Sequence, residues 1–375
     1  MKQTLTAKIQ ILVNDSDAEL LRETMMAYTA ACNCVSNYIF YHADLQRYRV
    51  QKETYYHLRN TYGLRSQMAI SCIRSVIGNY KTIIKNQGAW IMPVFKHPQL
   101  DLVWNRDYSL NIKKRLFSVN TLAGRIKVPF YNNNFEQYFS GIFSFGTAKL
   151  INKNDKFFLY IPITYELATL EKKEVCNVVG VDRGIRFVAV TYDSKGKTAF
   201  YSGKEINKKR THYDNLRRQL QSVGTPSSRR RLKALGRREN RWMQDVNHCI
   251  SKALVTNNPL GTLFVLEDLK NIRSSLSKTQ NKHRHTALSW AYFDLERKLI
   301  YKALRNHQVV ERVSPAYSSQ TCPKCGHTSR GNRKNRTHHF CCKNCGYSSN
   351  DDRVAAMNLH RRGIELLFLS AVATE

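Results

Sequence analysis

Two pairs of cysteines place the strongest constraint on what this chain can fold into. The stretch CPKCG contains Cys322 and Cys325, and FCCKNCG contains Cys342 and Cys345, so two Cys-x-x-Cys motifs are separated by sixteen residues. Four thiolates at this spacing are typical of a zinc ribbon, and a site without an open coordination position is structural. Cys341 is the spare thiol in this interpretation, and a register that uses Cys341 with Cys345 is the alternative.

The charge of the chain predicts its partner. The sequence has 60 Lys and Arg against 28 Asp and Glu, a formal net charge of +32. A folded chain tolerates such self-repulsion most easily when a polyanion supplies the opposite charge, so nucleic acid is the expected partner. An anionic membrane surface is the alternative, but the basic residues are spread along the chain rather than gathered in one amphipathic helix or tail.

One stretch is especially basic: residues 204–241 hold thirteen Lys or Arg against three acids. Leucines on both sides of a GTPSS break predict a helical hairpin there. We expect its basic faces to bind a nucleic-acid backbone, although a solvated hairpin is the alternative. The residues chosen for this role are Arg229, Arg230, Arg231, Lys233, Arg237 and Arg238.

The distribution of apolar residues bears on domains and compartment. A length of 375 residues predicts two or three domains, given typical domain sizes of about 100–200 residues. No apolar run approaches the roughly 20 residues that a membrane-spanning helix needs, and the N-terminus has no apolar signal region. The five cysteines outside the 322–345 cluster are scattered among apolar residues and are expected to be reduced. A cytoplasmic protein without membrane contact is therefore predicted.

The first half of the chain changes pattern twice. Residues 1–14 read as a strand, after which Ser16 and Glu19 have the spacing of a capping box that begins a helix. A second helix is expected at about 64–85, because apolar residues recur there on one side. From about 90 to 170 short alternating runs predict an antiparallel barrel or sandwich.

Three carboxylates in the second half occupy unusual positions. Asp182 lies within the apolar run VVGVDRGI, Glu267 ends the apolar run LFVLE, and Asp351 and Asp352 open a helical stretch. Each has an ordinary explanation: a turn residue, a helix cap, and a charge that complements a helix dipole.

Together these acids have a further interpretation, because buried carboxylates are costly unless cations neutralise them. A strand-borne Asp, a strand-end Glu and a helix-opening Asp can hold two Mg²⁺ ions about 3.5–4 Å apart for phosphodiester hydrolysis. Their order along the chain is that of an RNase H-like fold.

Several motifs carry a resemblance to a known family. VGVDRGI, FVLEDLKNI, LSWAYFDLERKLIYKA, SPAYSSQTCPKCGH, FCCKNCGY and DDRVAAMNL resemble transposon-encoded TnpB, a family of RNA-guided nucleases related to compact type V CRISPR effectors. The resemblance covers about residues 175–360. It implies that Asp182, Glu267 and Asp352 are the RuvC-type catalytic acids. Val354 stands where the family usually has Asn, so Asp351 remains the alternative to Asp352.

The resemblance also implies a multidomain α+β architecture. An N-terminal antiparallel β-barrel with an inserted helical lobe precedes an RNase H-like (RuvC) α/β nuclease domain with an inserted zinc ribbon. The expected boundaries are 1–14 and 90–170 for a wedge-type barrel, 15–89 for a helical recognition lobe, 171–314 and 349–375 for the nuclease domain, and 315–348 for the ribbon.

The implied function is an RNA-guided DNA endonuclease with two catalytic Mg²⁺ ions and one structural Zn²⁺ ion, which binds a guide RNA and target DNA beside a short adjacent motif. A nuclease-inactive RNA-guided DNA-binding protein is the alternative, and the presence of all three acids argues against it. A direct transposase is a third hypothesis, for which no strand-joining motif is evident. The guide sequence, the adjacent motif, the cleavage pattern and the oligomeric state do not follow from the sequence.

Overall fold

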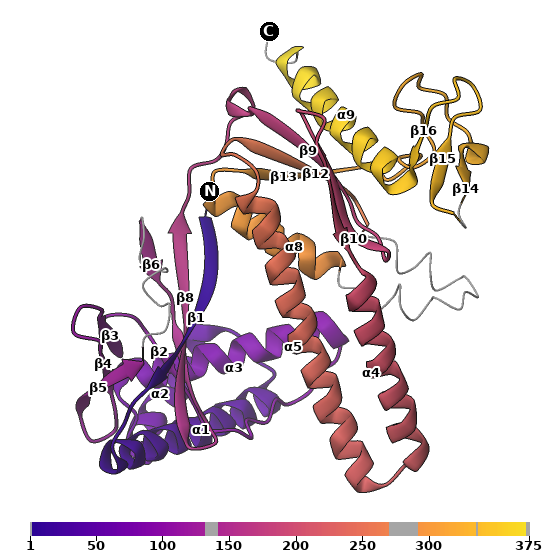
Figure 1. Ribbon diagram of the computed structural model, residues 1–375. Coiled ribbons are helices and arrows are strands. Elements are labelled where there is room, and N and C mark those ends of the chain that lie inside the picture. Colours follow the sequence, from indigo (N-terminus) through magenta and orange to yellow (C-terminus); the bar gives the residue numbers. More distant parts are fainter. Residues whose placement is uncertain (1, 132–141, 270–291, 335–336, 373–375) are drawn as a thin grey trace. The chain divides into compact units, whose positions relative to one another are not determined.

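The computed structural model describes residues 2–131, 142–269, 292–334 and 337–372 (Figure 1). The parts of the predicted domains at 132–141, 270–291 and 373–375 lie outside these ranges. The chain divides into two compact units, Met1–Leu167 and Ala168–Glu375, close to the predicted boundary at residue 170. The finer division of each unit into two domains stays a prediction, and each unit is described by itself.

The first unit is built on an antiparallel sheet, which confirms the strand-rich pattern. Its strands are β1 (Lys2–Ile11), β2 (Gln99–Leu102), β3 (Tyr108–Asn111), β4 (Leu116–Asn120), β5 (Arg125–Tyr131), β6 (Phe143–Phe145), β7 (Ala148–Lys153) and β8 (Lys156–Glu166). The order is β2-β7-β8-β1-β5-β4-β3, with β6 added to β8. No ladder joins β2 to β3 among the described strands, so the expected barrel is a half-barrel.

Three helices stand between β1 and β2, as the predicted helical insertion requires. They are α1 (Asp15–His42), α2 (Arg47–Tyr62) and α3 (Ser66–Gln87). The predicted capping box is wrong, because the Asn14 side chain caps α1 by accepting a hydrogen bond of 2.7 Å from the Asp17 amide. Ser16 instead lies inside the helix and donates to the Asn14 side chain at 3.0 Å. Asn14 is one residue earlier than the first helical position, where an N-cap oxygen can reach the free amides.

The second unit contains a mixed five-stranded sheet. Its strands are β9 (Asn177–Asp182), β10 (Phe187–Asp193), β11 (Thr198–Ser202), β12 (Thr262–Glu267) and β13 (Val309–Val313), in the order β11-β10-β9-β12-β13. The strands β9, β10 and β11 are antiparallel, whereas β12 is parallel to β9 and β13 is parallel to β12. Parallel neighbours require crossover segments: helices stand between β11 and β12 and between β12 and β13, and one more follows the last strand.

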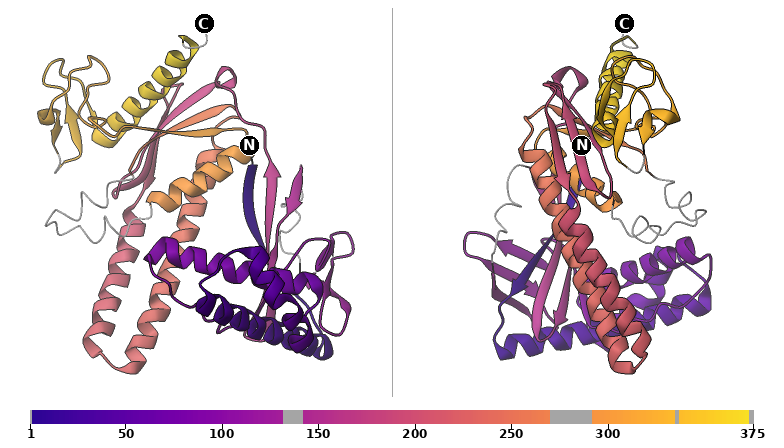
Figure 2. Two further views of the ribbon diagram at one scale, coloured as in Figure 1. Left: turned by 180° about the vertical axis from the view of Figure 1, so that it is seen from behind. Right: turned by 45° about the vertical axis from the view of Figure 1, so that its right-hand side comes forward.

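Helices cover both faces of this sheet (Figure 2). One face carries α5 (Pro226–Thr256) and α8 (Tyr292–Arg305), and the other carries α9 (Asp351–Val372). A Cβ atom built on Gly180 of β9 would lie 2.0 Å from the Ala356 backbone oxygen of α9, and one on Gly363 would lie 2.4 Å from the Val265 side chain of β12. Glycine at these two positions therefore lets α9 lie directly on the sheet.

The basic stretch forms the predicted helical hairpin, α4 (Lys204–Val223) and α5. Gly224 ends α4 with φ of 65°, and the Thr225 side chain then caps α5, with Pro226 in its first turn. Of the described helices, none combines the length and the hydropathy of a membrane-spanning segment.

Candidate active site and zinc site

Strand alternation brings two of the predicted acids to one face of the sheet. Val179 and Val181 of β9 pack toward α5 and α8, so Asp182 shares the opposite face with Val178. Glu267 occupies the equivalent position on β12, one residue beyond the last described pair of the parallel ladder, Leu266 with Val181. Asp182 and Glu267 therefore end neighbouring strands on the face that α9 covers.

Helical periodicity brings the third acid to the same face. Asp352 lies in the first turn of α9, and Ala356, Leu359 and Gly363 follow it at spacings of four, three and four residues. Leu359 packs against the sheet, and the backbone of Ala356 approaches Gly180 most closely. The first turn of α9 is thus held over the ends of β9 and β12.

The surroundings of Asp182 disfavour its ionised form. Burial raises the pKa of Asp182 well above its usual range, and the charges of Glu267 and Asp352 raise it further. The pKa of Asp352 is also raised, by burial and then by Asp351. Carboxylates that repel each other in a buried site favour a cation, and oxygen ligands of this kind suit Mg²⁺. The donor set therefore fits the predicted divalent metal ions.

Asp351 has a different environment. Its side chain is fully buried and accepts a hydrogen bond of 2.8 Å from Arg333, while His338 Nδ1 lies 3.4 Å from its other oxygen. Ligand atoms of His338, Asp351 and Asp352 lie within 4.8 Å of one another. Within the described ranges, the three predicted acids form no such tight group. The buried ion pair of Asp351 favours Asp352 as the acid that faces the site.

This difference predicts unequal effects of two substitutions. We expect Asp352→Ala to abolish cleavage of matched DNA. Asp351→Ala, which leaves Arg333 without its buried partner, should lower the thermal midpoint by several degrees but retain measurable cleavage. Cleavage rates and thermal melts of both variants test the assignment, with Asp351→Asn as the isosteric control. If the Asp352→Ala variant cleaves DNA faster than the Asp351→Ala variant, Asp351 rather than Asp352 is the metal ligand.

Ser318 contacts a predicted acid, although its motif SPAYSSQTCPKCGH gives no sign of that contact. It is 4% exposed and its hydroxyl donates a hydrogen bond to the Glu267 carboxylate. The Asn358 side chain of α9 in turn donates to the backbone oxygens of Ser318, at 2.7 Å, and Thr321, at 2.8 Å. The segment that leads into the cysteines is therefore fastened to α9 and to the strand-end acid together.

The predicted zinc cysteines meet in space. The sulfurs of Cys322, Cys325, Cys342 and Cys345 all lie within 4.8 Å of one another, and Cys341 is not among them. A small three-stranded sheet of β14 (Arg333–Lys334), β15 (His339–Cys341) and β16 (Ser348–Asn350) adjoins them: Cys322 and Cys325 precede it, and Cys342 and Cys345 lie between β15 and β16. The amide of His327 lowers the pKa of the Cys325 thiol to about 6, which favours the thiolate that metals bind. Four sulfurs in this arrangement fit a Zn²⁺ ion.

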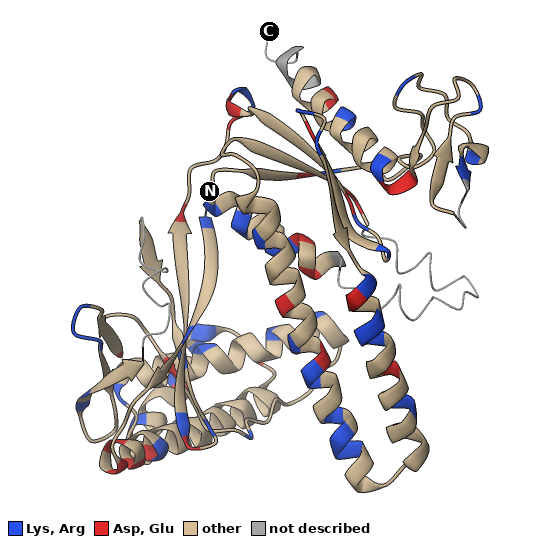
Figure 3. Cartoon of the chain, viewed as in Figure 1, with Lys and Arg blue, Asp and Glu red and all other residues tan. Residues whose placement is uncertain are grey.

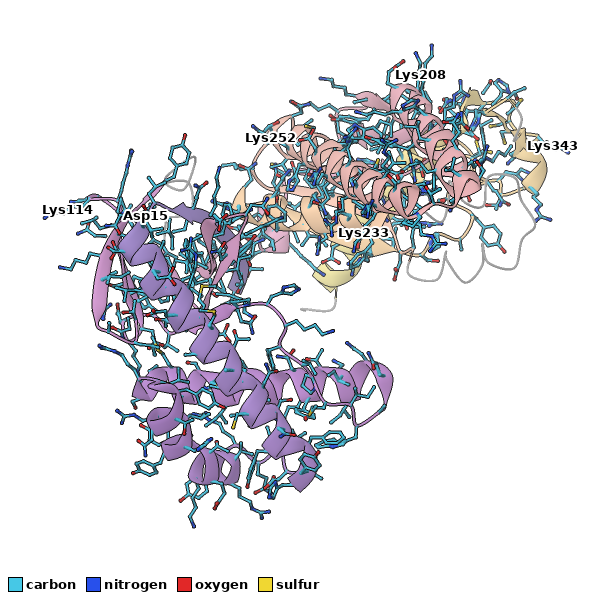
Figure 4. All side chains as sticks on the ribbon, turned by 90° about the horizontal axis from the view of Figure 1, so that it is seen from below. Asp15, Lys114, Lys208, Lys233, Lys252 and Lys343 are labelled. Atoms are coloured by element: carbon cyan, nitrogen blue, oxygen red, sulfur yellow. The ribbon has the colours of Figure 1, made fainter. Side chains whose placement is uncertain are left out.

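The six predicted nucleic-acid residues lie on the outer face of α5. All six are exposed. Lys and Arg residues line both helices of the hairpin (Figure 3), and Lys208 and Lys233 mark α4 and α5 in the view from below (Figure 4). Contact of these six residues with nucleic acid stays a prediction.

Two family models match the second unit and its boundary. A model described as "Probable transposase" matches residues 161–271, and one described as "Cas12f1-like, TNB domain" matches residues 292–359. The first ends just after Glu267, and the second runs from α8 to α9 and includes the four clustered cysteines.

Several curated proteins are similar to this chain. It is 26% identical to the CRISPR-associated endodeoxyribonuclease Cas12f1 of Sulfoacidibacillus thermotolerans, across 70% of this chain and 63% of that protein. It is 28% identical to a putative RNA-guided DNA endonuclease of Escherichia coli (strain K12), across 51% of this chain and 50% of that protein. A TnpB-like protein of Methanocaldococcus jannaschii is 27% identical, across 46% of this chain and 63% of its own length. The chain thus spans one half to two thirds of the length of these relatives.

The fold is shared with solved structures of compact effectors. The protein chain of a Cas12f1–sgRNA–target DNA complex superposes with a TM-score of 0.64 at 13% identity, covering 96% of this chain and 99% of that one. A mini-RNA-guided endonuclease, Cas_phi3, gives a TM-score of 0.54 at 11% identity, covering 96% and 92%. The family matches, the relatives and this common fold together show that the chain is similar to proteins described as transposase, TnpB-like protein and Cas12f1.

Proposed function

We propose that this protein is an RNA-guided DNA endonuclease that cleaves target DNA with divalent metal ions held by Asp182, Glu267 and Asp352. The observation that carries the proposal is that Asp182 and Glu267 end neighbouring strands on the face that α9 covers, where burial and the charges of Glu267 and Asp352 raise the pKa of Asp182. The strand order of the second unit supports an RNase H-like (RuvC) domain, because an antiparallel trio followed by two parallel strands is expected for that fold. The relatives named as RNA-guided or CRISPR-associated endonucleases support the substrate.

The roles of the chain's residues follow from their placement. When bound, two Mg²⁺ ions supply charge neutralisation for the attacking and leaving oxygens of the phosphodiester. Asp182 and Glu267 hold their carboxylates at fixed strand ends, and Asp352 brings a third carboxylate from the first turn of α9. Ser318 fixes the orientation of the Glu267 carboxylate. Metal ligands held in this way need little rearrangement during the reaction.

Sequence choice in this proposal is delegated to base pairing between a bound guide RNA and the target strand. The protein then recognises the shape and charge of the nucleic acids and a short motif beside the target. The net charge of +32 and the exposed cations of α5 suit that task. The ribbon, held by one structural Zn²⁺ ion on Cys322, Cys325, Cys342 and Cys345, supports the start of α9.

The basic hairpin can be tested by its salt dependence. We expect replacement of Arg229, Arg230 and Arg231 by Ala to weaken nucleic-acid binding and to flatten the slope of log affinity against log salt by about two to three. The slope should flatten because each phosphate contact releases about one counterion from the nucleic acid, and the alanine variant makes fewer of these contacts. Replacement of the same three residues by Lys keeps the charge and should keep the slope. An unchanged slope in the alanine variant would show that the hairpin is merely solvated.

The proposal is tested by purifying the protein with the RNA that it retains and sequencing that RNA. Linear DNA that carries the matching sequence beside a randomised flank is then incubated with the complex and Mg²⁺. We expect wild-type protein to cut a subset of flanks and Asp182→Ala to bind the same subset without cutting. A wild-type complex that binds matched DNA but cuts none of it would establish the alternative, a nuclease-inactive RNA-guided DNA-binding protein. Protein that retains no RNA would contradict both.

A further inference from the structure

A buried ion network lies directly behind the two strand-borne acids. The guanidinium of Arg183 donates a hydrogen bond of 2.8 Å to the Glu296 carboxylate of α8 and one of 2.6 Å to the backbone oxygen of Glu267. The other oxygen of Glu296 accepts from Arg312 of β13, through Nε at 2.6 Å and Nη2 at 2.5 Å. One carboxylate thus joins the ends of β9 and β13, the two strands that flank β12.

The network begins where the backbone ladder stops. Among the described pairs, the parallel register of β9 and β12 ends at Val181 with Leu266, one residue before the acids. Beyond that point the contact that crosses from β9 to β12 is the hydrogen bond from Arg183 to the Glu267 backbone oxygen. The side chain of the residue after one acid therefore holds the peptide group of the other.

Arg183 and Glu296 are so deeply buried that stabilisation of the fold alone does not explain the network. The side chain of Arg183 is 1% exposed and that of Glu296 is 8% exposed. Removing charges from water costs so much that well-packed apolar side chains at such sites are often equally or more stable. The apolar cluster that includes Val181, Phe264 and Leu266 already holds this face of the sheet together. What an ion network adds is a fixed geometry.

We propose that Arg183 and Glu296 are positioning residues that set the separation of the Asp182 and Glu267 carboxylates, and with it the affinity of the site for divalent metal ions. This inference rests on the proposed function, because it assigns a purpose to the metal-binding acids. Glu267 is held on two sides: Arg183 fixes its backbone, and the Ser318 hydroxyl fixes its carboxylate. Partners of metal ligands commonly change metal affinity by about 10–100-fold when they are altered.

The test compares variants of the full-length protein freed of RNA. Arg183→Lys keeps the charge but loses the two-pronged donor, and Glu296→Gln keeps the shape but loses the charge. Titration with Mn²⁺, in which electron paramagnetic resonance detects the free ion, measures the metal affinity directly. We expect each variant to bind Mn²⁺ at least about 10-fold more weakly than wild type. With guide RNA restored, cleavage at a fixed Mg²⁺ concentration should fall by about 100-fold, the effect of a small misplacement of catalytic groups.

Two further variants separate positioning from folding. The double variant Arg183→Met with Glu296→Leu removes the buried charges together, so it should fold with a thermal midpoint near that of wild type and still lose Mn²⁺ affinity. Arg297→Gln alters an exposed arginine beside Glu296 on the same helix and should change neither property.

Wild-type Mn²⁺ affinity in folded Arg183→Lys or in the double variant would overturn the inference. The inference would also be overturned if the loss of Mn²⁺ affinity in each variant were fully explained by its fraction of unfolded protein. If wild-type protein cuts no guide-matched DNA, the proposed function fails, and the Mn²⁺ titration still decides whether the network positions the acids.

Discussion

Asp182→Ala and Glu267→Ala should each lower the rate of matched-DNA cleavage by about a thousandfold or more while leaving guide and target binding nearly unchanged. Metal ions lower the activation free energy of phosphodiester hydrolysis by several kcal/mol. Because about 1.4 kcal/mol corresponds to a tenfold change in rate, loss of a metal ligand should have an effect of this size. Binding should persist because neither acid contributes a positive charge to the nucleic-acid surface. Single-turnover cleavage and equilibrium binding of the same preparations give the two quantities.

The isosteric changes Asp182→Asn and Glu267→Gln serve as controls for packing. If loss of the carboxylate charge is the cause, both should be as inactive as the alanine variants, and Asp182→Asn should melt at the wild-type temperature or above it. The melting point should not fall, because the pKa of Asp182 is raised by burial and repulsion, which means that its ionised form weakens the fold. Wild-type cutting by either alanine variant would show that these acids are not the metal ligands.

Cys325→Ser should lose zinc and cleavage together, whereas Cys341→Ser should keep both. Four thiolates bind Zn²⁺ with an apparent free energy of about 10–16 kcal/mol, more than a ribbon with so few apolar residues can supply by packing. The ribbon also contains Arg333 and His338, which contact Asp351 at the start of α9. Unfolding of the ribbon should therefore displace the adjacent residue, Asp352. Elemental analysis and cleavage assays of both variants test these expectations.

The two cysteines form a matched pair, because each substitution removes one sulfur from the same short ribbon. Only Cys325 belongs to the group of four sulfurs within 4.8 Å. A zinc-free Cys341→Ser protein, or a Cys325→Ser protein with a full complement of zinc, would show that the ligand set is wrong.

The parts of this fold that follow from local patterns were predictable. The apolar runs beside Asp182 and Glu267 are enough to put both acids on strands, and the two Cys-x-x-Cys motifs are enough to choose four sulfurs from ten cysteines. The hairpin was predictable because its Gly, Thr and Pro signals lie within a few residues of one another.

Features that depend on contacts between distant residues were not predictable. Helix α2 buries only Val50, Thr54 and Leu58, too narrow an apolar stripe to reveal the helix in the sequence. Arg183 and Glu296 are 113 positions apart in the sequence, and neither residue's neighbours in the chain identify the other as its partner. Ser318 is likewise assigned to Glu267 only by the fold.

The most direct test of RNA-guided cleavage by this protein is an exchange of guides. Two guide RNAs that differ only in the target-matching segment are each loaded on the protein, and each complex is given both matching DNAs with the same flank in Mg²⁺. We expect each complex to cut its own DNA and leave the other intact, and Asp182→Ala to cut neither. Cutting that is independent of the guide, or that proceeds without RNA, would contradict it.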